Sequence, residues 1–215
     1  ASYETNPRLT AIRKGDSSGH LKYSLLFKRP LFQGFLFTFN EAKKDKEAQI
    51  LENELLSLNL SNNEKSKLFY HLAEYTFNEQ KYLKKAEDYF DKSIQFAFWN
   101  SEKAYIYIAK ASFYMKDKKD PIGAEKYYKK ALELDYGIDS ILSLSNFYFN
   151  SNRQEEFEIF LNNEIKNSKN NENKIKLLEQ LLSTKKDDIE IEKLAKEILK
   201  LNKVNYKVNC TLASI

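Results

Sequence analysis

Apolar residues recur at three- and four-residue spacing from Asn40 onward, and short polar stretches interrupt this pattern. The spacing places the apolar side chains on one face of a helix, so it predicts a string of short amphipathic helices. The predicted helices span 66–78, 81–98, 101–115, 121–134, 140–150, 154–165, 173–183 and 188–201. Beyond Asn202, residues Val204, Tyr206 and Val208 alternate with polar neighbours, which predicts a short strand or an ordered tail.

The helices repeat in pairs. In the second helix of two successive pairs, small residues recur at the same places: Ala86 and Ser93 are followed 38 residues later by Ala124 and Ala131. The first helices are offset by 36 residues, as from Leu72 to Ile108, and the longer loop 116–120 accounts for the difference. Self-similarity at this period predicts a helical repeat architecture.

The stretches KAEDYFDKSI (85–94) and GAEKYYKKALELD (123–135) resemble the second helix of a tetratricopeptide repeat. Two sets of residues fit the first helix of that family, namely Phe69, Leu72, Ala73 and Tyr105, Ile108, Ala109. The resemblance implies an all-α, right-handed superhelical solenoid of helical hairpins. In this family, small residues such as Ala73 and Ala86, or Ala109 and Ala124, let the two helices cross closely.

The resemblance divides the chain into an irregular basic arm at 1–29, repeats at 30–165, a capping hairpin at 172–201 and a tail at 202–215. The four expected repeats lie at about 30–60, 66–98, 101–135 and 138–165. The outer two depart from the family. In the repeat at 138–165, Phe157 stands where the family has a small residue. In the repeat at 30–60, Leu36 stands where a small residue is usual, although the spacing of the family is kept by Phe32, Phe35, Phe39 and Ala48.

Residues 21–39 allow a second interpretation. Leu21, Tyr23, Leu25 and Phe27 alternate with mostly polar neighbours, and alternation resumes after Lys28-Arg29-Pro30 at Phe35. A β-hairpin therefore competes with the helix expected at 31–39.

The resemblance implies a non-catalytic scaffold that holds a segment of another protein against its concave face. Counting from the signature positions, the residues expected to line this groove are Gln33, Phe37, Lys67, Tyr70, Glu74, Phe77, Lys103, Ile106, Lys110, Phe113, Leu142, Asn146 and Phe149. Apolar surface interrupted by single charges suits an amphipathic helix or an extended peptide with apolar anchors. Family members that bind chaperone C-termini have Lys and Asn where this chain has Tyr70 and Glu74, and Glu74 would repel a carboxylate.

The net charge of +4 resides in the first 40 residues, which hold six Lys or Arg and two Asp or Glu. The remainder is balanced and offers little affinity for nucleic acid. The arm either caps the first helices or rests on an anionic membrane through Lys22, Lys28, Arg29, Phe32 and Phe35. If the arm rests on a membrane, the expected protein is an envelope-assembly lipoprotein whose lipid anchor lies upstream of Ala1. If the arm caps the helices, the expected protein is a cytoplasmic adaptor. The 31 Lys against four Arg suggest an AT-rich, bacterial genome.

Candidate chemistry is sparse. The Gly-x-Ser-x-Gly pattern of a hydrolase nucleophile turn occurs at Gly15-Asp16-Ser17-Ser18-Gly19, so a hydrolase that uses the loop serine is a remote alternative. That motif works only between a buried strand and a helix, whereas here it lies in a Gly- and Ser-rich loop. Two histidines and the single Cys210 cannot form a tetrahedral zinc site, and a Gly-rich phosphate loop is missing. We therefore expect no enzyme activity, metal or cofactor.

Overall fold

The computed structural model describes residues 53, 57, 59–76 and 83–214 of the chain. This part is all-helical and contains no strand, which confirms the expected all-α class. Its helices are α5 (Asn62–Thr76), α6 (Leu83–Phe96), α7 (Asn100–Lys116), α8 (Pro121–Leu134), α9 (Ile138–Asn150), α10 (Gln154–Asn167), α11 (Asn171–Leu182), α12 (Asp188–Leu201) and α13 (Tyr206–Ala213).

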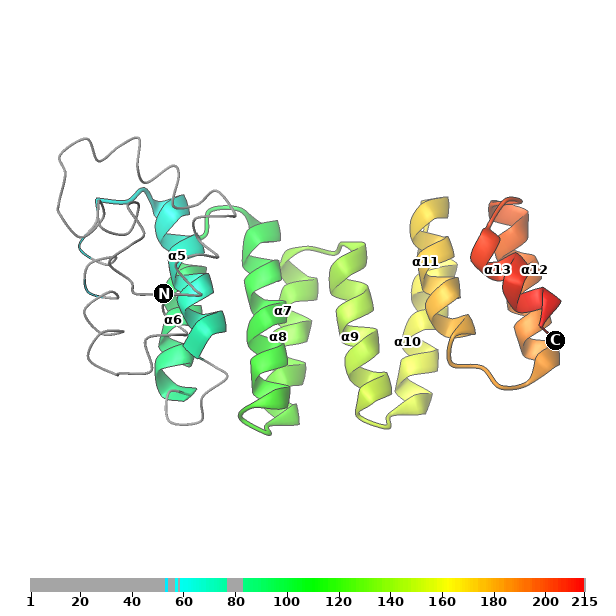
Figure 1. The fold of residues 1–215 in the computed structure, drawn as a ribbon, viewed down its shortest axis with the longest axis horizontal. Helices are drawn as coiled ribbons and strands as arrows, with labels where there is room; N and C mark the ends of the chain where they lie inside the picture. Colours follow the sequence, from blue (N-terminus) through cyan, green and yellow to red (C-terminus); the bar gives the residue numbers. More distant parts are fainter. Residues whose placement is uncertain (1–52, 54–56, 58, 77–82, 215) are drawn as a thin grey trace, which may run out of the picture.

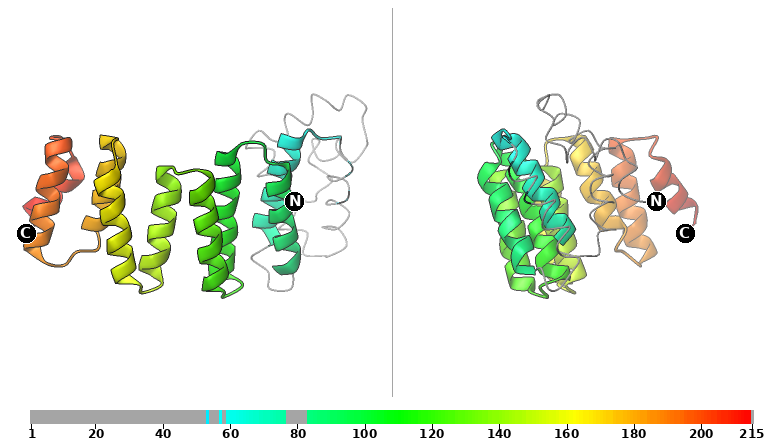
Figure 2. Two further views of the ribbon diagram at one scale, coloured as in Figure 1. Left: turned by 180° about the vertical axis from the view of Figure 1, so that it is seen from behind. Right: turned by 60° about the vertical axis from the view of Figure 1, so that its left-hand side comes forward.

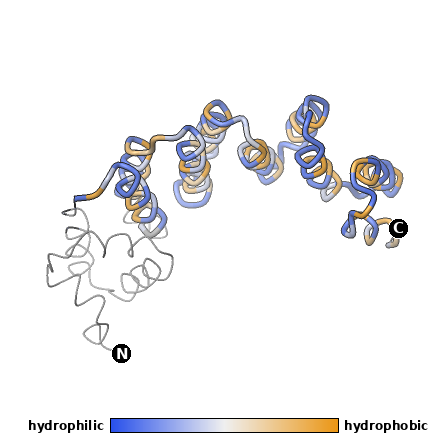
Figure 3. The backbone as a smooth tube through the Cα atoms, turned by 90° about the horizontal axis from the view of Figure 1, so that it is seen from above, coloured by the Kyte–Doolittle hydropathy of each residue, from blue (hydrophilic) through white to orange (hydrophobic). Residues whose placement is uncertain are grey.

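The helices stand side by side in an elongated row, with α5 at one end and α13 at the other (Figure 1). The same order is visible from behind (Figure 2, left). The main helix contacts join consecutive elements, and α7 also contacts α9. Seen down the helices, most of them carry both polar and apolar residues (Figure 3). The core is therefore a strip that runs along the row.

Several helices begin where the sequence carries a local signal. Asp120 accepts a hydrogen bond from the backbone N–H of Gly123, and Pro121 fills the first position of α8. Asp187 likewise accepts from the backbone N–H of Glu190 at the start of α12. Both helices have the bounds that the sequence predicts, and most other helix ends shift by one to four residues.

Small residues are buried where paired helices pack. Ala73 on α5 and Ala86 on α6 are both fully buried, as are Ala124 and Ala131 on α8. The Ser93 hydroxyl donates to the Ser66 carbonyl at 2.8 Å, which ties α6 to α5. These positions agree with the close approach expected from the repeat pattern, although Ala109 is only partly buried.

The third pair of helices tolerates the large residue at 157. Phe157 on α10 is fully buried, and its ring centroid lies 5.4 Å from that of Phe149 on α9. The departure from the small-residue pattern is therefore accommodated by an aromatic contact between the two helices.

Of the two alternatives for residues 204–208, a short strand or an ordered tail, the strand is wrong, because α13 occupies Tyr206–Ala213. The Asn205 side chain accepts from the Val208 N–H and caps this helix, while its amide donates to Glu179 at 2.7 Å. Val208 is fully buried. One buried apolar residue and a strong N-cap outweigh a short alternating pattern.

The predictions for the N-terminal part lie outside the described residues. They concern the basic arm, nearly all of the first expected repeat, the helix or hairpin at 21–39, the Ser17 loop and the five membrane-contact residues. Three groove residues, Gln33, Phe37 and Phe77, also lie outside. None of the described helices is long and apolar enough to cross a membrane.

An ion pair joins Glu125 on α8 to Arg153, the N-cap residue of α10, and a second pair within α8 involves the same carboxylate. Arg153 donates to Glu125 at 2.6 Å, and the Lys129 ammonium lies 2.8 Å from the same carboxylate. Burial raises the pKa of Glu125, but the hydrogen bonds from Arg153 and Lys129 outweigh this and leave the pKa below its usual value. Partly exposed pairs of this kind contribute about 0.2–1 kcal/mol.

We expect acid to weaken this junction. A carboxylate whose pKa is lowered by folding stabilises the protein above its unfolded pKa of about 4.3 and loses that contribution as the pH falls through the lower folded value. The free energy of unfolding, measured by urea denaturation, should therefore fall below about pH 4.3, and Glu125→Gln should reduce that slope. Glu133→Gln, on the exposed side of α8, should leave the slope unchanged. Equal slopes for both variants would contradict the role of Glu125.

Candidate functional site

The groove residues expected on α5 lie at or near the surface. Lys67 is exposed, while Tyr70 and Glu74 are half-buried. The Tyr70 hydroxyl donates to Glu74 at 2.7 Å and lies 3.3 Å from the hydroxyl of Tyr105 on α7. Burial, together with the hydrogen bonds to Tyr105 and Glu74, raises the pKa of Tyr70 well above its usual value. Tyr70 is therefore a neutral hydrogen-bonding group.

The groove residues expected on α7 lie mostly inside the protein. Ile106, Lys110 and Phe113 are only 2%, 1% and 1% exposed, and Lys103 is half-buried. The neighbouring Tyr105, which the repeat pattern assigns to the packing face, is instead 61% exposed. Helix α7 contacts α6, α8 and α9, so its buried residues occupy more than one side. Tyr105 is thus the surface residue on this helix that the pattern missed.

The groove residues expected on α9 lie on its partly exposed side. Leu142 is half-buried, whereas Asn146 and Phe149 are exposed. Asn146 accepts a hydrogen bond from Gln180 on α11 at 2.7 Å, and Ser145 donates to the same Gln180 side chain at 2.9 Å. Asn146 therefore helps to join α9 to α11.

An aromatic surface extends over α5 and α7. The Tyr70 and Tyr105 ring centroids are 5.4 Å apart, and His71 approaches Tyr70 edge-on at 5.2 Å. The imidazole Nδ1 of His71 lies 3.3 Å from Glu74. We call Tyr70, His71, Glu74 and Tyr105 the tyrosine surface. It combines an exposed aromatic ring with one carboxylate.

A buried lysine lies under a second group of tyrosines. The Lys110 ammonium is 2.6 Å from Asp91 on α6 and 4.7 Å from the centroid of the Tyr127 ring. Tyr107 stacks on Tyr127 with centroids 5.9 Å apart. Lys110 therefore joins α6, α7 and α8 as a packing residue.

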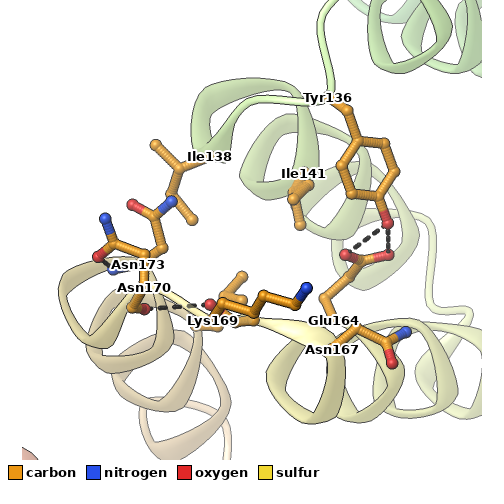
Figure 4. A pocket seen from close by; sticks show the side chains of 10 residues that line it. Tyr136, Ile138, Ile141, Glu164, Asn167, Lys169, Asn170 and Asn173 are labelled. Atoms are coloured by element: carbon orange, nitrogen blue, oxygen red, sulfur yellow. Dashed lines mark hydrogen bonds between the residues drawn. The ribbon is translucent and has the colours of Figure 1, made fainter.

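A cavity of about 310 Å³ opens where the helix ends of α9, α10 and α11 meet. Ile138, Ile141 and Leu177 form its apolar wall. Its polar lining comprises Tyr136, Glu164, Asn167, Ser168, Lys169, Asn170 and Asn173 (Figure 4). These residues come from separate elements, and no sequence motif marks them.

One side of the cavity holds a nearly buried carboxylate. Glu164 is 8% exposed, and the Tyr136 hydroxyl donates to its two oxygens at 2.6 and 2.7 Å. This hydrogen bond raises the pKa of Tyr136 to about 12, with a smaller contribution from burial. Among the described residues, no Lys or Arg nitrogen lies within 4 Å of the Glu164 oxygens.

Other chemistry is sparse in the described part of the chain. It contains no group of three or more His, Cys, Asp or Glu side chains arranged to hold a metal ion. Cys210 is exposed, and the Asp187 carboxylate caps the start of α12. The candidate sites in the described part of the chain are therefore the tyrosine surface and the cavity between α9, α10 and α11.

Comparison of the chain with family models, curated proteins and solved structures gives no match. The fold of the described residues defines the class as all-helical, with each helix packed mainly against the helices next to it in the sequence.

Proposed function

We propose that this chain is a non-catalytic scaffold of tetratricopeptide-like hairpins, arranged as a right-handed solenoid, that binds a segment of a partner protein. In support of this proposal, α5 packs on α6 and α7 packs on α8, and consecutive helices contact each other along the row. The small residues Ala73, Ala86 and Ala124 are buried, as expected where the paired helices cross. The single observation that carries the binding proposal is the exposure of Tyr105 beside Tyr70 on the neighbouring first helix.

The chemistry of the tyrosine surface favours a particular segment. An apolar side chain that covers the Tyr105 ring would contribute about 2 kcal/mol, as an aromatic anchor residue does. Glu74 favours a neutral or basic neighbour and opposes a carboxylate. The expected ligand is therefore an extended or helical segment with an apolar anchor and no acidic group beside it.

The position of the partner can be tested by photocrosslinking. A benzophenone amino acid at position 105 should give a discrete adduct in extracts of the source cell, because the side chain there is exposed at the proposed interface. The matched control is position 122 on α8, where Ile122 is 82% exposed but lies on the second helix of its hairpin. The same adduct at both positions, or none at position 105, would contradict the proposal.

A further inference from the structure

The cavity between α9, α10 and α11 contains a nearly buried carboxylate, Glu164, that forms no ion pair with a described Lys or Arg. The Glu164 carboxylate can accept several hydrogen bonds, yet it receives the single proton of Tyr136. Burying a carboxylate without a cation is costly, so such groups normally have a positively charged partner. The site therefore has room for a cation supplied from outside.

Lys169 provides the opposite charge on the same cavity. It is exposed, it has no ion pair among the described residues, and Figure 4 shows its side chain reaching into the cavity. Asn173, on the side opposite Glu164, adds an amide that can donate or accept. The Lys169 ammonium and the Glu164 carboxylate both face this cavity and lie more than 4 Å apart. Two opposite charges that are not paired with each other complement a ligand that is neutral overall and carries both charges.

The size and the wall of the cavity limit the ligand further. About 310 Å³ is at the lower end of small-molecule sites. Ile138, Ile141 and Leu177 form an apolar surface that suits an aliphatic side chain. We propose that this cavity binds a small zwitterion of the α-amino-acid class, with its ammonium on Glu164, its carboxylate on Lys169 and its side chain against the apolar wall.

The proposal predicts that both charges of the ligand are needed. Titration calorimetry on the full chain should show saturable binding of leucine. Leucinamide lacks the carboxylate and N-acetyl-leucine lacks the ammonium, so each should bind at least tenfold more weakly, about the effect of losing one charge-assisted hydrogen bond. No binding of leucine, or equal binding of leucine and leucinamide, would overturn the proposal; the second result would indicate a site for a simple ammonium group.

Variants of the two charged residues test the assigned contacts. Glu164→Gln keeps an acceptor for Tyr136, and Lys169→Met changes an exposed side chain, so both variants should retain the circular dichroism spectrum of the parent. Each should weaken leucine binding at least tenfold, while Glu155→Gln and Lys166→Met, exposed on α10 outside the cavity, should not. If Glu164→Gln fails to fold, Lys169→Met decides the question, and unchanged binding in that variant would contradict the proposal.

Discussion

Replacing Phe90 with alanine should lower the free energy of unfolding by about 3–5 kcal/mol. Phe90 on α6 is fully buried, and its ring centroid lies 5.7 Å from Phe113 on α7 and 6.5 Å from Tyr70 on α5. The substitution therefore opens a cavity where three helices meet. Because the stability of a domain is about 5–15 kcal/mol, the loss should be visible as a large shift of the urea midpoint.

Phe98→Ala is the matched control for this prediction. Phe98 is 75% exposed just after α6, so its removal should change the free energy of unfolding by no more than about 0.5 kcal/mol. Urea denaturation followed by circular dichroism compares the two variants directly. Similar effects of the two substitutions would show that α5, α6 and α7 do not share a core at Phe90.

Replacing Asp91 with alanine should also destabilise the protein, by about 1–3 kcal/mol. The Lys110 side chain is 1% exposed and its ammonium lies 2.6 Å from Asp91. Removing the partner of a fully buried charge typically costs 3–5 kcal/mol. Asp91 itself is 60% exposed, so water can partly replace its carboxylate, and we expect a smaller loss. Asp88→Ala, on the exposed side of the same helix, is the control.

The partner variant Lys110→Met should behave differently. Methionine fills a similar volume and removes the buried charge, so its effect on stability should lie within about 1 kcal/mol of zero. In the Lys110→Met background, Asp91→Ala should then cost less than about 0.5 kcal/mol, the usual range for a surface substitution. If Asp91→Ala costs the same in both backgrounds, the ion pair with Lys110 is not the reason for the loss.

Local signals made several helices predictable. Asp120 followed by Pro121 marks the start of α8, and Asp187 marks the start of α12. Such signals act within one turn of helix and need no knowledge of the tertiary structure. The alternation around Val208 was misleading because the decisive residue is the Asn205 cap, and its amide is also held by Glu179 on α11.

The surface of α7 could not be predicted from periodicity alone. Apolar spacing identifies one packing face, but α7 has neighbours on more than one side. Ile106 and Phe113 are consequently buried where the repeat pattern implies a groove, and Tyr105 is exposed where it implies packing. The cavity could not be predicted from the sequence, because Tyr136 and Glu164 are 28 residues apart and come together only in the folded chain.

The binding of a partner segment at the tyrosine surface is tested most directly with the segment that crosslinks at position 105. A synthetic peptide of that segment, titrated by fluorescence anisotropy, should bind the parent chain and lose at least tenfold in affinity with Tyr105→Ala, since an aromatic anchor contributes about 2 kcal/mol. Ile122→Ala should bind like the parent. Unchanged affinity with Tyr105→Ala, in a variant that keeps its helical spectrum, would contradict the proposed function.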